Sequence, residues 1–158
     1  MERRGIGGGR EIAVFPFAFQ DTSIEGEVGG VDPTETARLS MITREVETRL
    51  AARGAEIFDL SGREETIAGL PDPWDCLDCA APIARSAEAR ANLTGFVHKV
   101  STLIQSISII AHDTETDRML GNASVSIRGN TDEAWRRGVD FILKRGLLGE
   151  EAETALNR

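Results

Sequence analysis

EIAVFPF, residues 11–17, is rich in Val, Ile and Phe and too short for a helix, so it predicts a buried β-strand that ends near Pro16. Asp32-Pro33-Thr34-Glu35 then predicts a helix start, because Asp32 can cap it, Pro33 suits the first turn and Glu35 can close a capping box. Gly54 ends that helix, and EIFDL, residues 56–60, predicts a second strand. Strand, helix and strand joined by tight turns imply a parallel pair and therefore α/β architecture.

The C-terminal half predicts an antiparallel addition to this unit. Residues 93–100 begin a third strand, and residues 103–113 and 118–128 form a hairpin around a short turn. A last helix follows, capped at Asn130, with Trp135 in the core. We therefore expect a single-domain mixed β-sheet of about five strands, packed by three or four helices.

The composition limits the domain count and the classes of partner. The 158 residues suffice for one domain, which we place at 11–149, between a disordered segment at 1–10 and a polar tail at 150–158. A net charge of -8 disfavours nucleic acid and anionic lipid, and no stretch approaches the roughly 20 apolar residues that a membrane span needs. The sequence therefore predicts neither nucleic-acid binding nor membrane insertion. No signal peptide is visible, because glycines 7–9 stand where its apolar region should be.

Cys76 and Cys79 are the only cysteines, and their C-x-x-C spacing permits a redox dithiol, half of a zinc site or a structural disulfide. Asp72, Asp75 and Asp78 surround them with negative charge, which opposes the thiolate that exchange chemistry requires. A zinc site would need further Cys or His, and the chain has two His. The pattern favours a structural disulfide in a turn before a helix that starts near Pro82, with redox and metal roles as alternatives.

The segment 20–31 reads as a flexible glycine-containing loop at the end of the first strand. Because ligands collect at the carboxyl ends of parallel strands, Asp21, Thr22 and Ser23 are the candidate ligand or partner contacts. The competing interpretation is that these three side chains only satisfy backbone groups in a turn.

Two further segments are weighed as sites. Arg128, Asn130 and Thr131 precede the last helix and form a candidate anion site at its N-terminus, although capping by Asn130 explains the same residues. His98 and Lys99 point to opposite faces of a strand, so they cannot serve one pocket. We expect His98 to be partly buried, Lys99 to be a surface charge and His112 to be solvated.

Four segments resemble the bacterial DUF2380 or DUF3280 type, a family of unknown function: AVFPF with DTS (residues 13–17 and 21–23), CLDC (76–79), VHKVSTLI (97–104) and RGNTDEAW (128–135). The strand ending in Phe-Pro-Phe, the polar loop, the long helix and the returning strand are also similar to the N-terminal domain of TolB and to CsgG-like envelope domains. The resemblance implies a periplasmic mixed-sheet module that works through protein contacts. The cytoplasm is the alternative compartment.

The sequence as a whole therefore predicts a non-enzymatic envelope protein that binds a protein partner. It predicts no cofactor, no metal and no catalytic residue, and it leaves the oligomeric state open. Two alternatives stay beside this interpretation: a thiol-disulfide redox protein that uses Cys76 and Cys79, and a small-ligand binder that uses the loop after the first strand.

Overall fold

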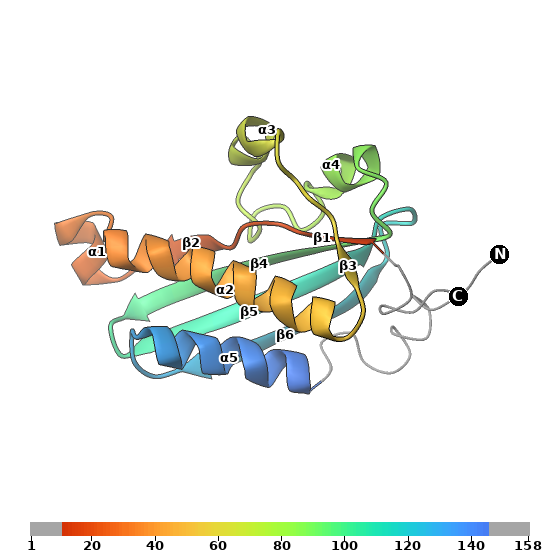
Figure 1. The fold of residues 1–158 in the computed structure, drawn as a ribbon. Helices are drawn as coiled ribbons and strands as arrows, with labels where there is room; N and C mark the ends of the chain where they lie inside the picture. Colours follow the sequence, from red (N-terminus) through yellow and green to blue (C-terminus); the bar gives the residue numbers. More distant parts are fainter. Residues whose placement is uncertain (1–10, 146–158) are drawn as a thin grey trace.

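The computed structural model describes residues 11–145, which form a six-stranded mixed sheet packed by five helices (Figure 1). The strands are β1 (Glu11–Val14), β2 (Ala18–Asp21), β3 (Glu56–Ile57), β4 (Ala91–Ser101), β5 (Ile104–Asp113) and β6 (Met119–Ile127). The helices are α1 (Ile24–Gly29), α2 (Pro33–Ala52), α3 (Glu64–Ala68), α4 (Ala81–Ser86) and α5 (Asp132–Lys144). The predicted α/β class is confirmed.

The sheet has the strand order β3-β1-β4-β5-β6, with β2 also paired to β4. β1 is parallel to β3 and β5 is antiparallel to β6, as the sequence predicts. β4 joins the two units, because it pairs parallel with β1 and antiparallel with β5. β1 and β2 therefore follow one another along β4, separated by Phe15, Pro16 and Phe17. Proline has no N–H to give to a ladder, which explains why the pairing stops there.

The main core lies between the sheet and the two long helices, α2 and α5, which run side by side along one face (Figure 1). Trp135 of α5 is fully buried in this core, as predicted, and its indole Nε1 donates a hydrogen bond to Gln105 Oε1 at 2.7 Å. Gly138 brings α5 close to the sheet, because a Cβ there would lie 3.0 Å from Ile107 Cδ1 and from Ile127 Cγ2. A small side chain at this point therefore sets the spacing of the layers.

A second, smaller apolar cluster lies on the opposite face of β1. Ala13 and Phe15 pack there against α4 and its flanks, through Ala80, Ile83 and Ala84. Residues alternate between faces along a strand, so Ile12 and Val14 enter the main core while Ala13 enters this cluster. β1 is thus buried on both faces, as its continuous apolar run predicts.

Several sequence-based expectations differ in detail. The predicted flexible loop at 20–31 contains the end of β2 and the short helix α1, and the strand predicted at 56–60 pairs over Glu56–Ile57 alone. The sheet has six strands instead of about five, and the described helices number five. The predicted disordered segment 1–10, the tail 150–158 and the last residues of the 11–149 domain lie outside the described residues, 11–145.

Candidate functional site

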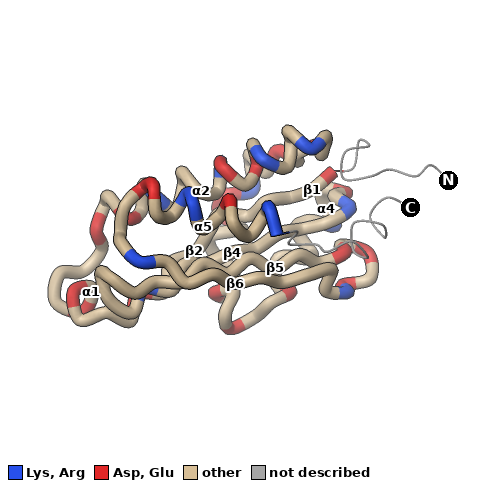
Figure 2. The backbone as a smooth tube through the Cα atoms, turned by 90° about the horizontal axis from the view of Figure 1, so that it is seen from below, with Lys and Arg blue, Asp and Glu red and all other residues tan. Residues whose placement is uncertain are grey.

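One end of the molecule brings together segments that are far apart in the sequence. α1, the turn between β4 and β5, and the loop between β6 and α5 lie at this end (Figures 1 and 2). The reason is the topology: β2 ends at Asp21 beside Lys99 of β4, two residues before β4 itself ends. Both predicted site loops, 21–23 and 128–131, belong to this assembly.

Asp21, Thr22 and Ser23 form the start of α1. Ser23 caps the helix by accepting a hydrogen bond from Gly26 N at 3.0 Å, and Asp21 Oδ1 accepts from Ser23 N at 2.9 Å. A Cβ at Gly26 would overlap the Asp21 carboxylate, so a larger residue there would displace this side chain from its hydrogen bond to Ser23 N. These contacts satisfy backbone groups, as the competing interpretation of the loop states. The same three residues also border a hollow of about 560 Å³ between α1, β2 and α2.

A buried ion pair lies behind this loop. Lys99 Nζ is 2.6 Å from Glu35 Oε2, and the two side chains are 6% and 3% exposed. Burial alone would lower the pKa of Lys99, but the hydrogen bond and the negative charge of Glu35 outweigh it and raise that pKa. The expectation that Lys99 is a surface charge is therefore wrong.

The same Glu35 oxygen holds the loop between β6 and α5. Asn130 Nδ2 donates to Glu35 Oε2 at 2.6 Å, while Asn130 Oδ1 accepts from Arg38 Nη1 at 2.7 Å. Arg38 also reaches Asp132 at 2.7 Å through its Nε. The side-chain amide of Asn130 is thus bonded on both sides to α2, and the loop is fixed to that helix.

The predicted anion site at the start of α5 has most of its donors occupied. Thr131 Oγ1, and not Asn130, caps the helix by accepting from Ala134 N at 3.1 Å, and Asp132 and Glu133 place negative charge in the first turn. Arg128 is exposed. The structure brings Asn130 to Glu35 and leaves Arg128 and Thr131 at the surface, so anion binding there stays a prediction.

His98 and Lys99 point to opposite faces of β4, as the alternation of the strand predicts. His98 Nε2 is 2.9 Å from Thr22 Oγ1, whereas Lys99 reaches Glu35 on α2. His112 of β5 is 4% exposed, so the expectation of a solvated side chain is wrong. It lies opposite the buried Asn92 of β4 in the antiparallel register.

Large apolar side chains are exposed at this end of the molecule. Ile24, Val28 and Val31 are 74%, 83% and 85% exposed. Ile24 and Val28 lie one turn apart on the same side of α1, and Val31 follows the end of this helix. The end of β4, the turn after it and the start of β5 add Val100, Leu103 and Ile104, which are 48%, 68% and 49% exposed. We call these six residues the apolar end.

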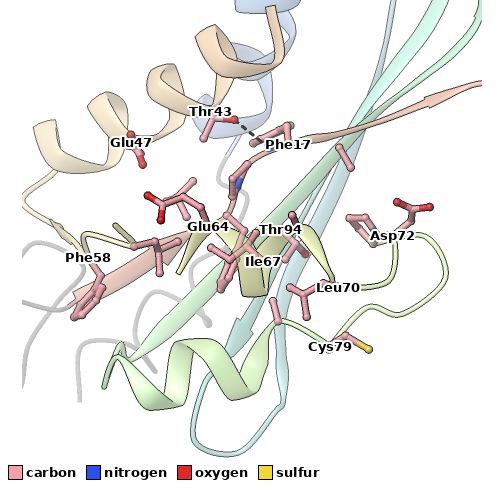
Figure 3. A pocket seen from close by; sticks show the side chains of 18 of the residues that line it. Phe17, Thr43, Glu47, Phe58, Glu64, Ile67, Leu70, Asp72, Cys79 and Thr94 are labelled. Atoms are coloured by element: carbon pink, nitrogen blue, oxygen red, sulfur yellow. Dashed lines mark hydrogen bonds between the residues drawn. The ribbon is translucent and has the colours of Figure 1, made fainter. Parts of the chain in front are cut away.

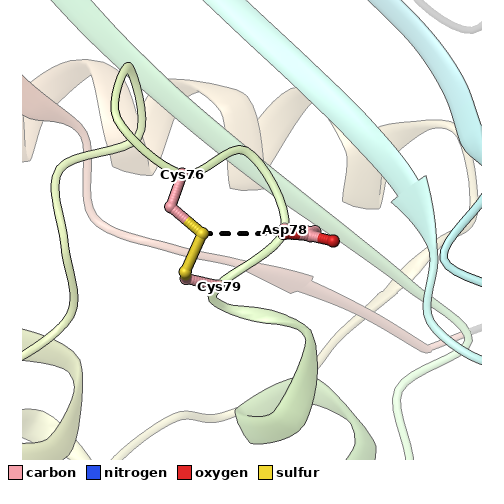
Figure 4. The surroundings of a disulfide bond; sticks show 3 residues. All are labelled: Cys76, Asp78 and Cys79. Carbon is pink, nitrogen blue, oxygen red and sulfur yellow. Dashed lines mark hydrogen bonds between the residues drawn. A yellow bond between two sulfur atoms is a disulfide. The ribbon is translucent and has the colours of Figure 1, made fainter.

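Cys76 and Cys79 are joined by a disulfide in a turn before α4, the position that the sequence predicts for them (Figure 4). Cys76 Sγ is 3.6 Å from Asp78 Oδ1. The two cysteine Sγ atoms and a carboxylate oxygen of Asp78 lie within 4.8 Å of one another. These three residues are therefore where the alternative prediction, a metal site, would be tested. Trp74 anchors the turn by its edge-on contact with Phe96 of β4, at 5.3 Å between ring centres.

Sequence reasoning missed the Glu35–Lys99 pair and the apolar end. The local pattern predicts a capping-box role for Glu35, and Lys99 is 64 residues away, so no local pattern joins the two side chains. The exposed face of α1 did have a signal, because Ile24 and Val28 are four residues apart, which is helical spacing. The three glycines in that segment obscured it.

These features define a small α/β protein built on a single mixed sheet, without a described helix that is long and apolar enough to cross a membrane. The chain belongs to the family DUF3280, described as "Protein of unknown function (DUF2380)", which matches residues 10–147. This confirms the family resemblance that the sequence indicates. No curated protein matches the chain.

Solved bacterial structures share the fold at low sequence identity. Lipoprotein GNA1162 from Neisseria meningitidis is 18% identical with a TM-score of 0.54, over 89% of this chain and 97% of that one. The LpoB C-terminal domain from Salmonella enterica is 15% identical with a TM-score of 0.52, over 81% and 85%. The PelC dodecamer from Paraburkholderia phytofirmans is 13% identical with a TM-score of 0.52, over 90% and 91%. The resemblance to TolB and CsgG-like domains stays a prediction.

Proposed function

We propose that this chain is a non-enzymatic module of the bacterial cell envelope that binds a protein partner through the apolar end. The fold similarity to a Neisseria lipoprotein supports the compartment, and the cytoplasm is the alternative. The observation that carries the proposal is the exposure of six large apolar side chains on two segments at one end of the sheet. Exposed apolar groups that gather in this way mark interaction surfaces.

The surroundings of the apolar end resemble the usual arrangement of an interface, in which apolar side chains are bordered by polar ones. Glu25 and Glu27 alternate with the apolar residues of α1 and lie in its first turn. Their charge favours a partner whose contact surface is apolar at its centre and basic at its edge. A basic edge on the partner also agrees with the net charge of -8 of this chain.

The buried polar groups behind the apolar end support it as a preformed surface. Thr22 N donates to Lys99 O at 3.0 Å, and Lys99, Glu35 and Asn130 link β4, α2 and the loop before α5. A segment held in its bound conformation loses less entropy on association. The backbone of the apolar end is therefore ordered before the partner binds.

The test compares partner recovery by three forms of the full chain in the bacterium that encodes it. Val28→Asp with Leu103→Asp places charge in the apolar end, and Met119→Asp is the matched control, because Met119 is a 42% exposed apolar residue beside the opposite turn of the sheet. We expect the double variant to lose the protein that co-purifies stoichiometrically with the wild type, and the control to retain it. Equal recovery by all three forms would refute the proposal.

A second copy of this chain is the other occupant to test. Light scattering of the purified protein measures its mass, and self-association abolished by Val28→Asp with Leu103→Asp would identify a homo-oligomer as the complex formed by the apolar end. A monomer that still binds its partner identifies a different protein. Self-association that survives both substitutions would contradict the assignment of this surface to self-contact.

A further inference from the structure

A cleft of about 740 Å³ opens at the carboxyl ends of β1 and β3 (Figure 3). Its walls come from the bend after β1, from the segment after β3, from α2 and α3, and from the turn that holds Cys76 and Cys79. In open α/β sheets, ligands bind in the crevice outside the carboxyl ends of strands. The volume falls in the range of small-molecule sites, about 300–1,000 Å³.

The cleft is lined mainly by apolar and aromatic side chains. Phe15 and Phe17 from the bend after β1 are buried, and Phe58 from the segment after β3 is half-buried. Ile67 and Leu70 add aliphatic surface from α3 and the segment after it. These walls suit an apolar, ring-sized body.

Thr94 of β4 supplies an unpaired polar group to this apolar surface. Its side chain lines the cleft (Figure 3), Thr94 is 7% exposed, and its Oγ1 is buried with no hydrogen-bond partner. A buried hydroxyl without a partner costs about 1–3 kcal/mol. By contrast, Thr43 Oγ1, which also lines the cleft, donates to Leu39 O and accepts from Phe17 N. Thr94 is therefore available to a ligand.

The charged residues that line the cleft are all acidic: Glu47, Asp59, Glu64 and Asp72. No Lys, Arg or His is among the described residues that line it. Glu47 on α2 and Glu64 on α3 both extend into the region shown in Figure 3. Asp59 Oδ1 and Glu64 Oε1 each accept hydrogen bonds from the Ser61–Gly62 turn, which fixes these two carboxylates at the cleft.

The half-buried Glu47 is the acid that most needs a counter-charge. Burial raises its pKa, the positive charge of Arg44 acts in the opposite direction, and the negative charge of Asp59 adds to the rise. The other nearby guanidinium, that of Arg63, lies 5.5 Å from the centre of the Phe58 ring and does not line the cleft. A ligand cation between Glu47 and Asp59 would relieve the repulsion between these two acids.

We propose that this cleft binds a small aromatic or aliphatic amine that also carries a hydroxyl or carbonyl group. The apolar body packs against Phe15 and Phe58, the ammonium group meets Glu47 and its neighbouring carboxylates, and the second polar group pairs with Thr94 Oγ1. This cleft is separate from the apolar end, so the amine proposal and the partner proposal are tested independently of each other.

Three matched compounds test the proposal on the full chain by calorimetry and by amide chemical shifts. Tyramine carries both polar groups, phenethylamine lacks the hydroxyl, and 3-(4-hydroxyphenyl)propionate replaces the ammonium by a carboxylate. We expect tyramine to bind at least tenfold more tightly than the propionate and about threefold more tightly than phenethylamine. Equal or tighter binding of the propionate would overturn the assignment of a cation.

Variants then assign each contact. Thr94→Val should remove the advantage of tyramine over phenethylamine, and Glu47→Gln should reduce the discrimination against the propionate. Thr22→Val is the matched control, because Thr22 lies outside the cleft lining. An advantage of tyramine that survives Thr94→Val would refute the role of the hydroxyl.

A blocking variant keeps the proposal falsifiable if the buried Thr94→Val protein fails to fold. Ala68 of α3 is exposed and lines the cleft, so Ala68→Trp can fill the opening without changing the core. We expect it to abolish tyramine binding while far-UV circular dichroism stays that of the wild type. Tyramine binding by a folded Ala68→Trp protein at wild-type affinity would show that the compound binds elsewhere.

Discussion

Lys99 and Glu35 show how a single buried contact supports the surface that we assign to a partner. Two charges that are 6% and 3% exposed have lost most of their hydration, so each depends on the other for compensation, and Glu35 also accepts a hydrogen bond from Asn130. Removing one partner leaves the other charged and buried, which is costlier than removing both. The pair therefore fixes α2 to β4 at the end where the interaction surface lies.

We expect Lys99→Met or Glu35→Gln alone to lower the free energy of unfolding by about 3–5 kcal/mol. The double variant Glu35→Gln with Lys99→Met should lose less than the sum of the two, because it leaves no unpaired charge. Urea denaturation of the four proteins gives the coupling energy. Additive losses would mean that the two side chains do not interact in solution.

The pH dependence of stability follows from the same pair. The folded pKa of Lys99 is raised, so its contribution is complete below the unfolded value of about 10.4 and is lost as the pH rises through the folded value. The chain has no Tyr, and Lys99 and Lys144 are its two lysines, so few other groups titrate there.

We therefore expect the free energy of unfolding to fall as the pH rises above about 10.4, measured by urea titration of the oxidised protein. Lys99→Met should show a much smaller fall, whereas Lys144→Met should behave as the wild type. The same slope in Lys99→Met and in the wild type would contradict the account.

At this scale the sequence predicts orientation better than burial. The alternation of β4 correctly places His98 and Lys99 on opposite faces, since this depends only on the geometry of a strand. Whether a face is covered depends on a helix that lies 64 residues away, and that information is not local. The error at Lys99 has this cause, whereas His112 is buried on the opposite face of the sheet, where it pairs in register with Asn92.

At the scale of elements, α1 is a helix that local contacts hold in place without a core of its own. None of its residues is buried, and its start depends on Ser23, whose Oγ accepts from Gly26 N. Losing such a cap costs about 0.5–2 kcal/mol. Since α1 adds little to the core, this loss should open the helix locally.

We expect Ser23→Ala to speed amide hydrogen exchange at Gly26 and Glu27 about fivefold or more, with the midpoint of global urea denaturation changed little. Hydrogen exchange followed by NMR measures both. A global loss of stability equal to the local one would show that α1 is part of the cooperative core.

The turn at residues 72–79 contains the disulfide between Cys76 and Cys79, which closes a loop of few residues. We propose that this disulfide is structural, since Trp74 holds the turn on Phe96 and the adjacent carboxylates oppose a thiolate. The loop-entropy model gives a contribution of about 1–2 kcal/mol for so short a loop.

Cys76→Ser with Cys79→Ser should therefore lower the free energy of unfolding by about 1–2 kcal/mol and leave binding at the apolar end unchanged. Thermal denaturation of this variant and of the reduced wild type provides the measurement. Rapid disulfide exchange of the wild type with glutathione, absent from the variant, would instead support the redox alternative.

For the whole molecule, the sequence predicts the architecture through a few strong local patterns. EIAVFPF at 11–17, the cap at Asp32-Pro33 and the alternation of 103–113 each determine an element, and their order leaves a parallel pair followed by an antiparallel hairpin. The sequence does not predict β2, because its four residues are only half-buried and follow Pro16.

The sites were harder to predict than the fold, because they arise where elements meet. The apolar end combines α1 with a turn some 70 residues later, and the cleft combines segments from Val14 to Thr94. The predicted loop at Asp21, Thr22 and Ser23 lies beside the first of these and outside the lining of the second. The order of the strands in the sheet brings such segments together, and the local sequence pattern of one element does not reveal that order.

Site-specific photo-crosslinking in the encoding bacterium tests the central claim, that the apolar end is where a protein partner binds. A photoreactive amino acid is placed at Val28, at Leu103 or, as the control, at Met119 beside the opposite turn of the sheet. We predict that Val28 and Leu103 cross-link to one and the same protein and that Met119 does not. No cross-link above that of Met119 at either position, or different proteins at Val28 and Leu103, would contradict the account.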